Sequence, residues 1–140
     1  MQVQPYLDFN GRCEEALNFY REVLSAKILL LKHYKDSPVP DMMPPQYNDK
    51  VMHAEFQIGE SILMATDGHC VDNAQPPSGF SLSMEFSDAE QVRRLFDKLS
   101  NGGRIDMPLA PTFWSPLFGS LTDRFGISWY IGVETPAVQG

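Results

Sequence analysis

The chain has 140 residues, which suits one domain, or one pair of fused half-domains, with a core of its own. It is 43% hydrophobic and 21% charged, as globular proteins are, and its formal net charge of −7 disfavours a nucleic-acid partner or an anionic membrane surface. No basic start with an apolar core opens the sequence, and no apolar run approaches the roughly 20 residues of a membrane-spanning helix. We therefore expect a cytoplasmic protein without membrane contact, whose Cys13 and Cys70 are free thiols.

The first half of the chain predicts a strand, a helix, a strand and a hairpin. Residues 5–9 predict the first strand, and Asn10 is placed to cap a helix whose apolar residues recur at helical spacing: Cys13, Ala16, Leu17, Tyr20, Val23 and Leu24. Residues 27–33 predict a second strand, and residues 51–56 and 61–66 predict a hairpin. Between them, residues 35–48 hold four prolines with Met42 and Met43, which predicts a long loop that forms a lid or a dimer contact.

The second half repeats this pattern after a loop at residues 67–79. Residues 80–86 alternate strictly between apolar and polar side chains and predict a strand. Ser87 and Glu90 predict a capping box for a helix that buries Val92, Leu95, Phe96 and Leu99 and ends at two glycines. Strands near residues 104–107, 117–122 and 127–133 complete the unit.

The order βαβββ therefore occurs twice. We assign residues 1–67 to a first module and residues 68–140 to a second. We expect an α+β fold in which the modules form a curved mixed sheet around a cup, with the helices on its outer face.

The strands divide into an apolar face and a polar face, because neighbouring side chains in a strand point to opposite sides. Met52, Ala54 and Phe56 belong to the apolar face, whereas the polar face carries Gln4, Tyr6, His53, Glu55, Ser81, Glu85, Ser128 and Tyr130. A solvated sheet face and a concave face that lines a cavity both fit this pattern. The large aromatic residues on the polar face favour the cavity.

Five stretches of the chain, in order, resemble the vicinal oxygen chelate superfamily of glyoxalase I, bleomycin-resistance proteins and extradiol dioxygenases, and within it the PhnB-like branch. They are residues 5–9, the Phe19-Tyr20 pair, and residues 51–56, 112–114 and 121–129. The resemblance implies a homodimer, and a divalent metal held by four positions that map to Gln4, His53, Ser81 and Tyr130. The branch is also labelled as similar to a demethylubiquinone methyltransferase, but the sequence holds no Gly-rich loop for a nucleotide-like methyl donor.

The four metal positions are poorly filled, since serine and neutral tyrosine are poor ligands for a metal such as zinc or nickel. We expect no cofactor; if a divalent metal binds, its candidate ligands are His53, Gln4 and Glu55. His53 could instead act as a general base beside Glu55 or as a hydrogen-bonded cup residue.

The expected function is that of a small-molecule-binding protein. We predict ligand contacts in the cup from Gln4, Tyr6, His53, Glu55, Ser81, Glu85, Trp114 and Tyr130, with Trp114 either at the cavity mouth or in the core. The alternative is a metal-dependent lyase, isomerase or dioxygenase, for which the sequence identifies no catalytic residue. A cup face with carboxylates and without Lys or Arg favours a cationic or polyhydroxylated ligand over a phosphonate.

Overall fold

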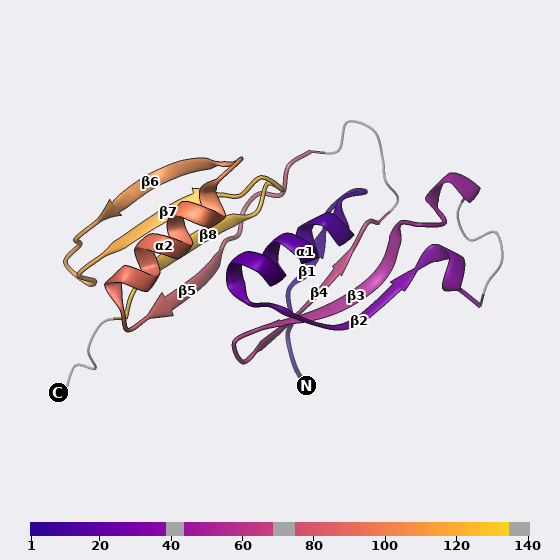
Figure 1. Ribbon diagram of the computed structural model, residues 1–140, viewed down its shortest axis with the longest axis horizontal. Helices are drawn as coiled ribbons and strands as arrows, with labels where there is room; N and C mark the ends of the chain where they lie inside the picture. The colour runs from indigo at the N-terminus through magenta and orange to yellow at the C-terminus, as the bar shows by residue number, and fades with distance from the viewer. Residues whose placement is uncertain (39–43, 69–74, 135–140) are drawn as a thin grey trace. The chain divides into compact units, whose positions relative to one another are not determined.

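The computed structural model describes residues 1–38, 44–68 and 75–134, and the chain forms two compact units, Met1–Ala74 and Gln75–Gly140 (Figure 1). Met42, Met43 and Cys70 lie outside the described residues, so the lid or dimer contact expected of the methionines stays a prediction. No helix in the described ranges is long and apolar enough to cross a membrane.

The first unit is a βαβββ module. Its elements are β1 Tyr6–Asp8, α1 Cys13–Leu24, β2 Lys27–His33, β3 Val51–Ile58 and β4 Ser61–Thr66, with short 3₁₀ turns at Tyr34–Asp36 and Pro45–Tyr47. The sheet order is β1-β4-β3-β2, in which β1 and β4 are parallel and the other pairs are antiparallel. The core packs the Tyr20 ring of α1 against the Phe56 ring of β3, stacked with centroids 6.1 Å apart.

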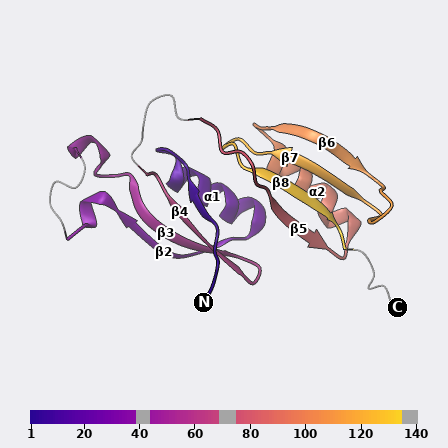
Figure 2. The ribbon, with the colours of Figure 1, turned by 180° about the vertical axis from the view of Figure 1, so that it is seen from behind.

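The second unit repeats that order. Its elements are β5 Leu82–Phe86, α2 Ala89–Ser100, β6 Arg104–Ala110, β7 Phe118–Thr122 and β8 Ser128–Val133, and its sheet order is β5-β8-β7-β6. Again the first and last strands are parallel and the rest antiparallel. Figure 1 views this sheet from the side that α2 covers, and Figure 2 views it from the uncovered side. The prediction of an α+β fold with two βαβββ modules is confirmed.

Strand parity holds in β8 but shifts in β3. In β8, Trp129 and Ile131 are buried and Tyr130 between them is exposed, as the alternation predicts. In β3 the buried residues are Val51, Ala54 and Phe56, so Met52 does not belong to the buried face. The cause is a β-bulge: Lys32 pairs with His53 and His33 with Val51, which leaves Met52 as the extra residue.

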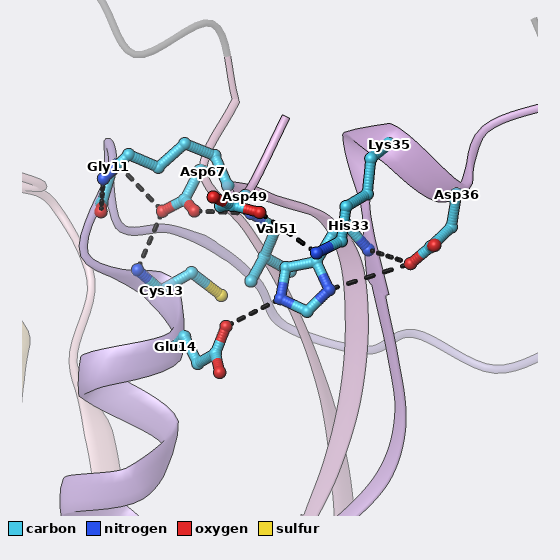
Figure 3. Close-up of polar contacts among 10 residues, drawn as sticks. Gly11, Cys13, Glu14, His33, Lys35, Asp36, Asp49, Val51 and Asp67 are labelled. Atoms are coloured by element: carbon cyan, nitrogen blue, oxygen red, sulfur yellow. Dashed lines mark hydrogen bonds and ion pairs between the residues drawn. The ribbon is translucent and has the colours of Figure 1, made fainter. Parts of the chain in front are cut away.

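Asn10 does not cap α1, so that prediction is wrong. Asn10 has a φ of 48°, and Arg12 occupies the N-cap position without a side-chain hydrogen bond. The capping carboxylate comes instead from Asp67, just after β4. Its Oδ1 accepts from the backbone N–H of Gly11 at 2.8 Å and of Cys13 at 2.7 Å, while its Oδ2 accepts from Val51 N–H at 2.7 Å (Figure 3). One buried side chain thus ties together the start of α1, the start of β3 and the end of β4.

The Ser87–Glu90 capping box is also wrong, because α2 begins one residue later than that box requires. Asp88 is the N-cap, and its carboxylate accepts from Glu90 N–H at 3.1 Å. On the buried face of α2, Val92, Phe96 and Leu99 are buried as predicted, but Leu95 is only half-buried.

His33 belongs to a separate polar cluster at the end of β2. Its Nε2 lies 2.7 Å from Glu14 Oε1 of α1, and its Nδ1 lies 3.7 Å from Asp36 Oδ2 (Figure 3). The cluster fastens α1 to the segment after β2, which is a structural role.

Candidate functional site

The first module brings three of the predicted site residues together. Tyr6 lies on β1, and its hydroxyl is 2.8 Å from His53 Nδ1 on β3. Glu55, two residues further along β3, has its Oε1 3.8 Å from His53 Nε2. We call Tyr6, His53 and Glu55 the polar trio.

One arrangement of protons satisfies both contacts of the polar trio when the imidazole is neutral. Burial raises the pKa of Tyr6, so its hydroxyl stays protonated at neutral pH and can donate to His53 Nδ1. A neutral imidazole that accepts at Nδ1 carries its proton on Nε2, on the side of Glu55. In this arrangement the polar trio presents hydrogen-bond donors and acceptors at the exposed face of the sheet.

Gln4 makes its contact elsewhere. It precedes β1, and its Nε2 donates to the backbone carbonyl of Ile62 at 3.4 Å. Its amide therefore helps to fasten the chain before β1 to β4.

Four aromatic side chains follow one another in the second module. Ring centroids are 4.7 Å apart for Phe113 and Trp114, 5.3 Å for Trp114 and Phe118, and 5.6 Å for Phe118 and Tyr130, the last pair stacked. We call these four residues the aromatic row. Trp114 is 43% exposed, so it is not a core residue. Gly132 makes room for the row, because a Cβ there would lie 2.8 Å from the Phe118 ring.

An open hollow of about 1260 Å³ lies at the edge of the second sheet where β5, β6 and β8 begin and β7 ends. Two of the predicted contacts, Ser81 and Tyr130, line it, and two others, Glu85 and Trp114, do not. Ser81 Oγ lies 2.7 Å from Ser128 Oγ, so two hydroxyls face the hollow as a bonded pair. Among the lining residues that the predicted ligand contacts omitted are Phe80, Arg104, Asp106, Thr122, Arg124 and Ser128.

The hollow contains arginine, which corrects the expectation of a polar face without Lys or Arg. Arg104 Nε donates to Asp106 Oδ1 at 2.8 Å, and Thr122 Oγ1 donates to Asp106 Oδ2 at 2.7 Å. The Arg104 and Thr122 hydrogen bonds together lower the pKa of Asp106, which stays ionised. Arg124 donates from Nε and Nη2 to the Asn101 carbonyl, at 3.1 and 2.9 Å.

The residues at the superfamily's metal positions do not fit a chelated divalent ion. The Gln4 amide is bonded to a backbone carbonyl, the Ser81 hydroxyl to Ser128, and Tyr130 stacks on Phe118. Of the four, only His53 offers a strong ligand atom, and the Gln4 amide, which donates from its nitrogen, has only its weaker carbonyl oxygen to offer. Within the described ranges, no three His, Cys, Asp or Glu side chains converge in a way that could hold a metal ion.

Comparison with known proteins gives matches over nearly the whole chain. A family profile described as 3-demethylubiquinone-9 3-methyltransferase matches residues 1–132. Protein YjdN of Escherichia coli strain K12 is 34% identical over 141 aligned positions, with 95% of each chain covered. Protein PA1353 of Pseudomonas aeruginosa is 38% identical, with a TM-score of 0.85 over 97% of this chain and 99% of that one. The PhnB protein of Bacillus cereus is 29% identical, with a TM-score of 0.81 over 95% and 99%.

More distant structures share the fold alone. A glyoxalase-related enzyme from Fulvimarina pelagi is 17% identical with a TM-score of 0.60, covering 96% of this chain and 88% of that one. The fosfomycin resistance protein FosX of Listeria monocytogenes is 10% identical with a TM-score of 0.64, covering 96% and 93%. These neighbours carry the glyoxalase-like fold that the resemblance implied.

Proposed function

Because the chain belongs to the PhnB-like family described as 3-demethylubiquinone-9 3-methyltransferase, with the fold of the vicinal oxygen chelate superfamily, we propose that it binds a small molecule on the uncovered faces of its sheets. Methyl transfer is not part of the proposal, since the sequence holds no Gly-rich loop for a nucleotide-like donor. A protein that binds and holds a small molecule without catalysing a reaction needs neither a metal nor a cofactor.

The observation that carries this proposal is the exposed aromatic row beside the hollow. Tyr130 belongs to both: its ring stacks on Phe118, and its side chain lines the hollow. Ligand sites in proteins are concave and combine apolar or aromatic walls with a few polar groups. The hollow offers this combination through Phe80, Tyr130 and the Ser81–Ser128 hydroxyl pair.

The two tryptophans make ligand binding measurable. Trp114 is 43% exposed in the aromatic row, whereas Trp129 is 2% exposed in the core. In a thermal-shift screen of small metabolites, we expect each genuine ligand also to change the emission of Trp114. Tyr130→Ala should weaken binding by about tenfold, the scale of losing one aromatic contact, and Trp114→Phe should remove the emission change while Trp129 still reports the fold.

The control for this screen is Arg93→Ala on the exposed side of α2, which should bind normally. A ligand that binds Tyr130→Ala as tightly as the wild-type protein, or that Arg93→Ala weakens instead, would refute the proposed surface.

The polar trio is the second surface that we propose to contact ligand. Its hydroxyl, imidazole and carboxylate present donors and acceptors in a row on one face of the first sheet. His53→Ala is the variant that tests this part of the proposal, because it removes the central member without touching the buried side of β3.

We expect metal dependence to be weak or absent, because two of the four superfamily positions hold Ser81 and Tyr130. Protein purified without a histidine tag should contain substoichiometric metal by elemental analysis and show only a small thermal shift with nickel, zinc or manganese. A near-stoichiometric metal that is lost in His53→Ala would contradict this expectation and favour the metal-dependent enzyme.

We also propose that the protein is a homodimer in the cytoplasm. The edge strand β6 exposes Ile105 and Met107, apolar side chains that a second copy would cover. Light scattering at micromolar concentration should give about twice the chain mass of 15.8 kDa. A mass equal to that of a single chain would rule the dimer out.

A further inference from the structure

We infer that the hollow of the second module takes an aromatic carboxylate, with the carboxylate on Arg104 and the ring against Phe80 and Tyr130. This inference rests on the proposed function and narrows it to one class of ligand.

Arg104 is oriented for such a ligand by its neighbours. Its Nε donates to Asp106, which is held from the other side by Thr122. A guanidinium has five N–H donors, and this bond uses one of them. The remaining N–H groups on the Nη atoms form the planar fork that pairs with both oxygens of a carboxylate.

The charges that line the hollow balance one another, although the whole chain carries a net charge of −7. Two arginines and two aspartates line it: Arg104, Arg124, Asp106 and Asp123. Asp123 is only 3% exposed, and its oxygens accept from the N–H groups of Phe125, Ile127 and the Trp129 indole. Its oxygens are therefore directed into the protein, so Asp106 is the carboxylate at the exposed surface of the hollow, and Arg104 is the cation that we infer binds the ligand.

The walls of the hollow suit a flat ring. Phe80 is 46% exposed and Tyr130 is 37% exposed, so both rings are available for contact. Tyr130 is also backed by the Phe118 ring at an interplanar angle of 25°, which limits its movement. In the bonded pair of Ser81 and Ser128, one hydroxyl proton lies between the two oxygens and the other can be donated to a ligand oxygen.

The experiment follows backbone amide shifts of the ¹⁵N-labelled full chain during titration with four probes: benzoate, benzamide, acetate and inorganic phosphate. Benzoate should shift the amides of Phe80, Ser81, Arg104 and Ser128. Benzamide has the ring without the charge and acetate has the charge without the ring, so each should bind about tenfold more weakly, as should phosphate.

Arg104→Gln should weaken benzoate binding by about tenfold or more, and Arg104→Lys should restore part of it, because lysine keeps the charge but lacks the fork. The matched control is Arg93→Gln on α2. It also removes one cation whose guanidinium lies 2.8 Å from an acidic neighbour, so the net charge changes equally. It should bind benzoate as the wild-type protein does.

Equal binding of benzoate and benzamide, equal binding of benzoate and either small anion, unchanged binding in Arg104→Gln, or equal loss in Arg93→Gln would each overturn the inference. So would the absence of any benzoate shift around the hollow. If benzoate fails while a neutral compound still changes Trp114 emission and needs Tyr130, the ligand class is wrong and the proposed function stands.

Discussion

Replacement of Asp67 by asparagine is expected to lower the free energy of unfolding by about 3–5 kcal/mol, although the side chain keeps its size. The carboxylate accepts on both oxygens: Gly11 and Cys13 N–H bind Oδ1, and Val51 N–H binds Oδ2. Asparagine has one acceptor oxygen and one NH₂ donor. The NH₂ group of asparagine would therefore face a backbone N–H donor with no acceptor between them, at a site that is only 1% exposed. Urea unfolding followed by circular dichroism measures the loss.

The matched control is Asp88→Asn. Asp88 caps α2 at an exposed position through a single bond to Glu90 N–H, and asparagine caps helices about as well as aspartate. We expect a change below about 0.5 kcal/mol there. If both variants unfold at the same urea concentration, the buried carboxylate does not hold the first module together as described.

Leu99→Ala is expected to cost about 2–5 kcal/mol of stability, and Leu95→Ala clearly less, below about 2 kcal/mol. Both residues lie on the apolar stripe of α2, so the sequence places them on the same face. The structure separates them: Leu99 is 0% exposed, whereas Leu95 is only half-buried at the margin of the interface. The removed methyl groups of Leu99 would leave a cavity, and those of Leu95 would leave space that water can enter.

The comparison of these two variants needs no ligand and no assay of activity. Chemical unfolding of both proteins under one condition is sufficient, with the slope of the transition checked for constancy. Equal losses would mean that α2 packs on its sheet through a different face from the one described.

The local pattern of apolar and polar residues was sufficient to predict the helices and strands. The β-prone runs at 27–33 and 61–66 match the bounds of β2 and β4. The helix stripes match the buried faces of α1 and α2, except that Val23, Leu24 and Leu95 are only half-buried. Two of the failures depend on contacts between distant residues. The cap of α1 comes from Asp67, and the bulge at Met52 is defined by its partner strand, so neither could be read from the neighbouring sequence.

The candidate site was predicted in part for the same reason. Parity placed Tyr6, His53 and Glu55 on one face, and the structure brings them into contact. Arg104 and Asp106 are not among the predicted contacts, although they alternate with Ile105 and Met107 along the predicted strand at 104–107 and so fall on one side of it. The hollow itself depends on the course of residues 75–81 past Gly126, where Pro77 lies 3.5 Å from the position of a Cβ. Such a path is set by tertiary packing.

The two helices differ in when their first turns can be completed during synthesis. The cap of α2 lies next to it in the chain, so α2 can begin to form as soon as residues 88–100 have left the ribosome. The first turn of α1 can be capped only after Asp67 has been synthesised, 54 residues downstream of Cys13. Closing so long a loop is slow compared with forming a helical turn. We therefore expect the first turn of α1 to stay uncapped until the last strand of the N-terminal module has emerged. The second module, in contrast, can start folding from its own helix.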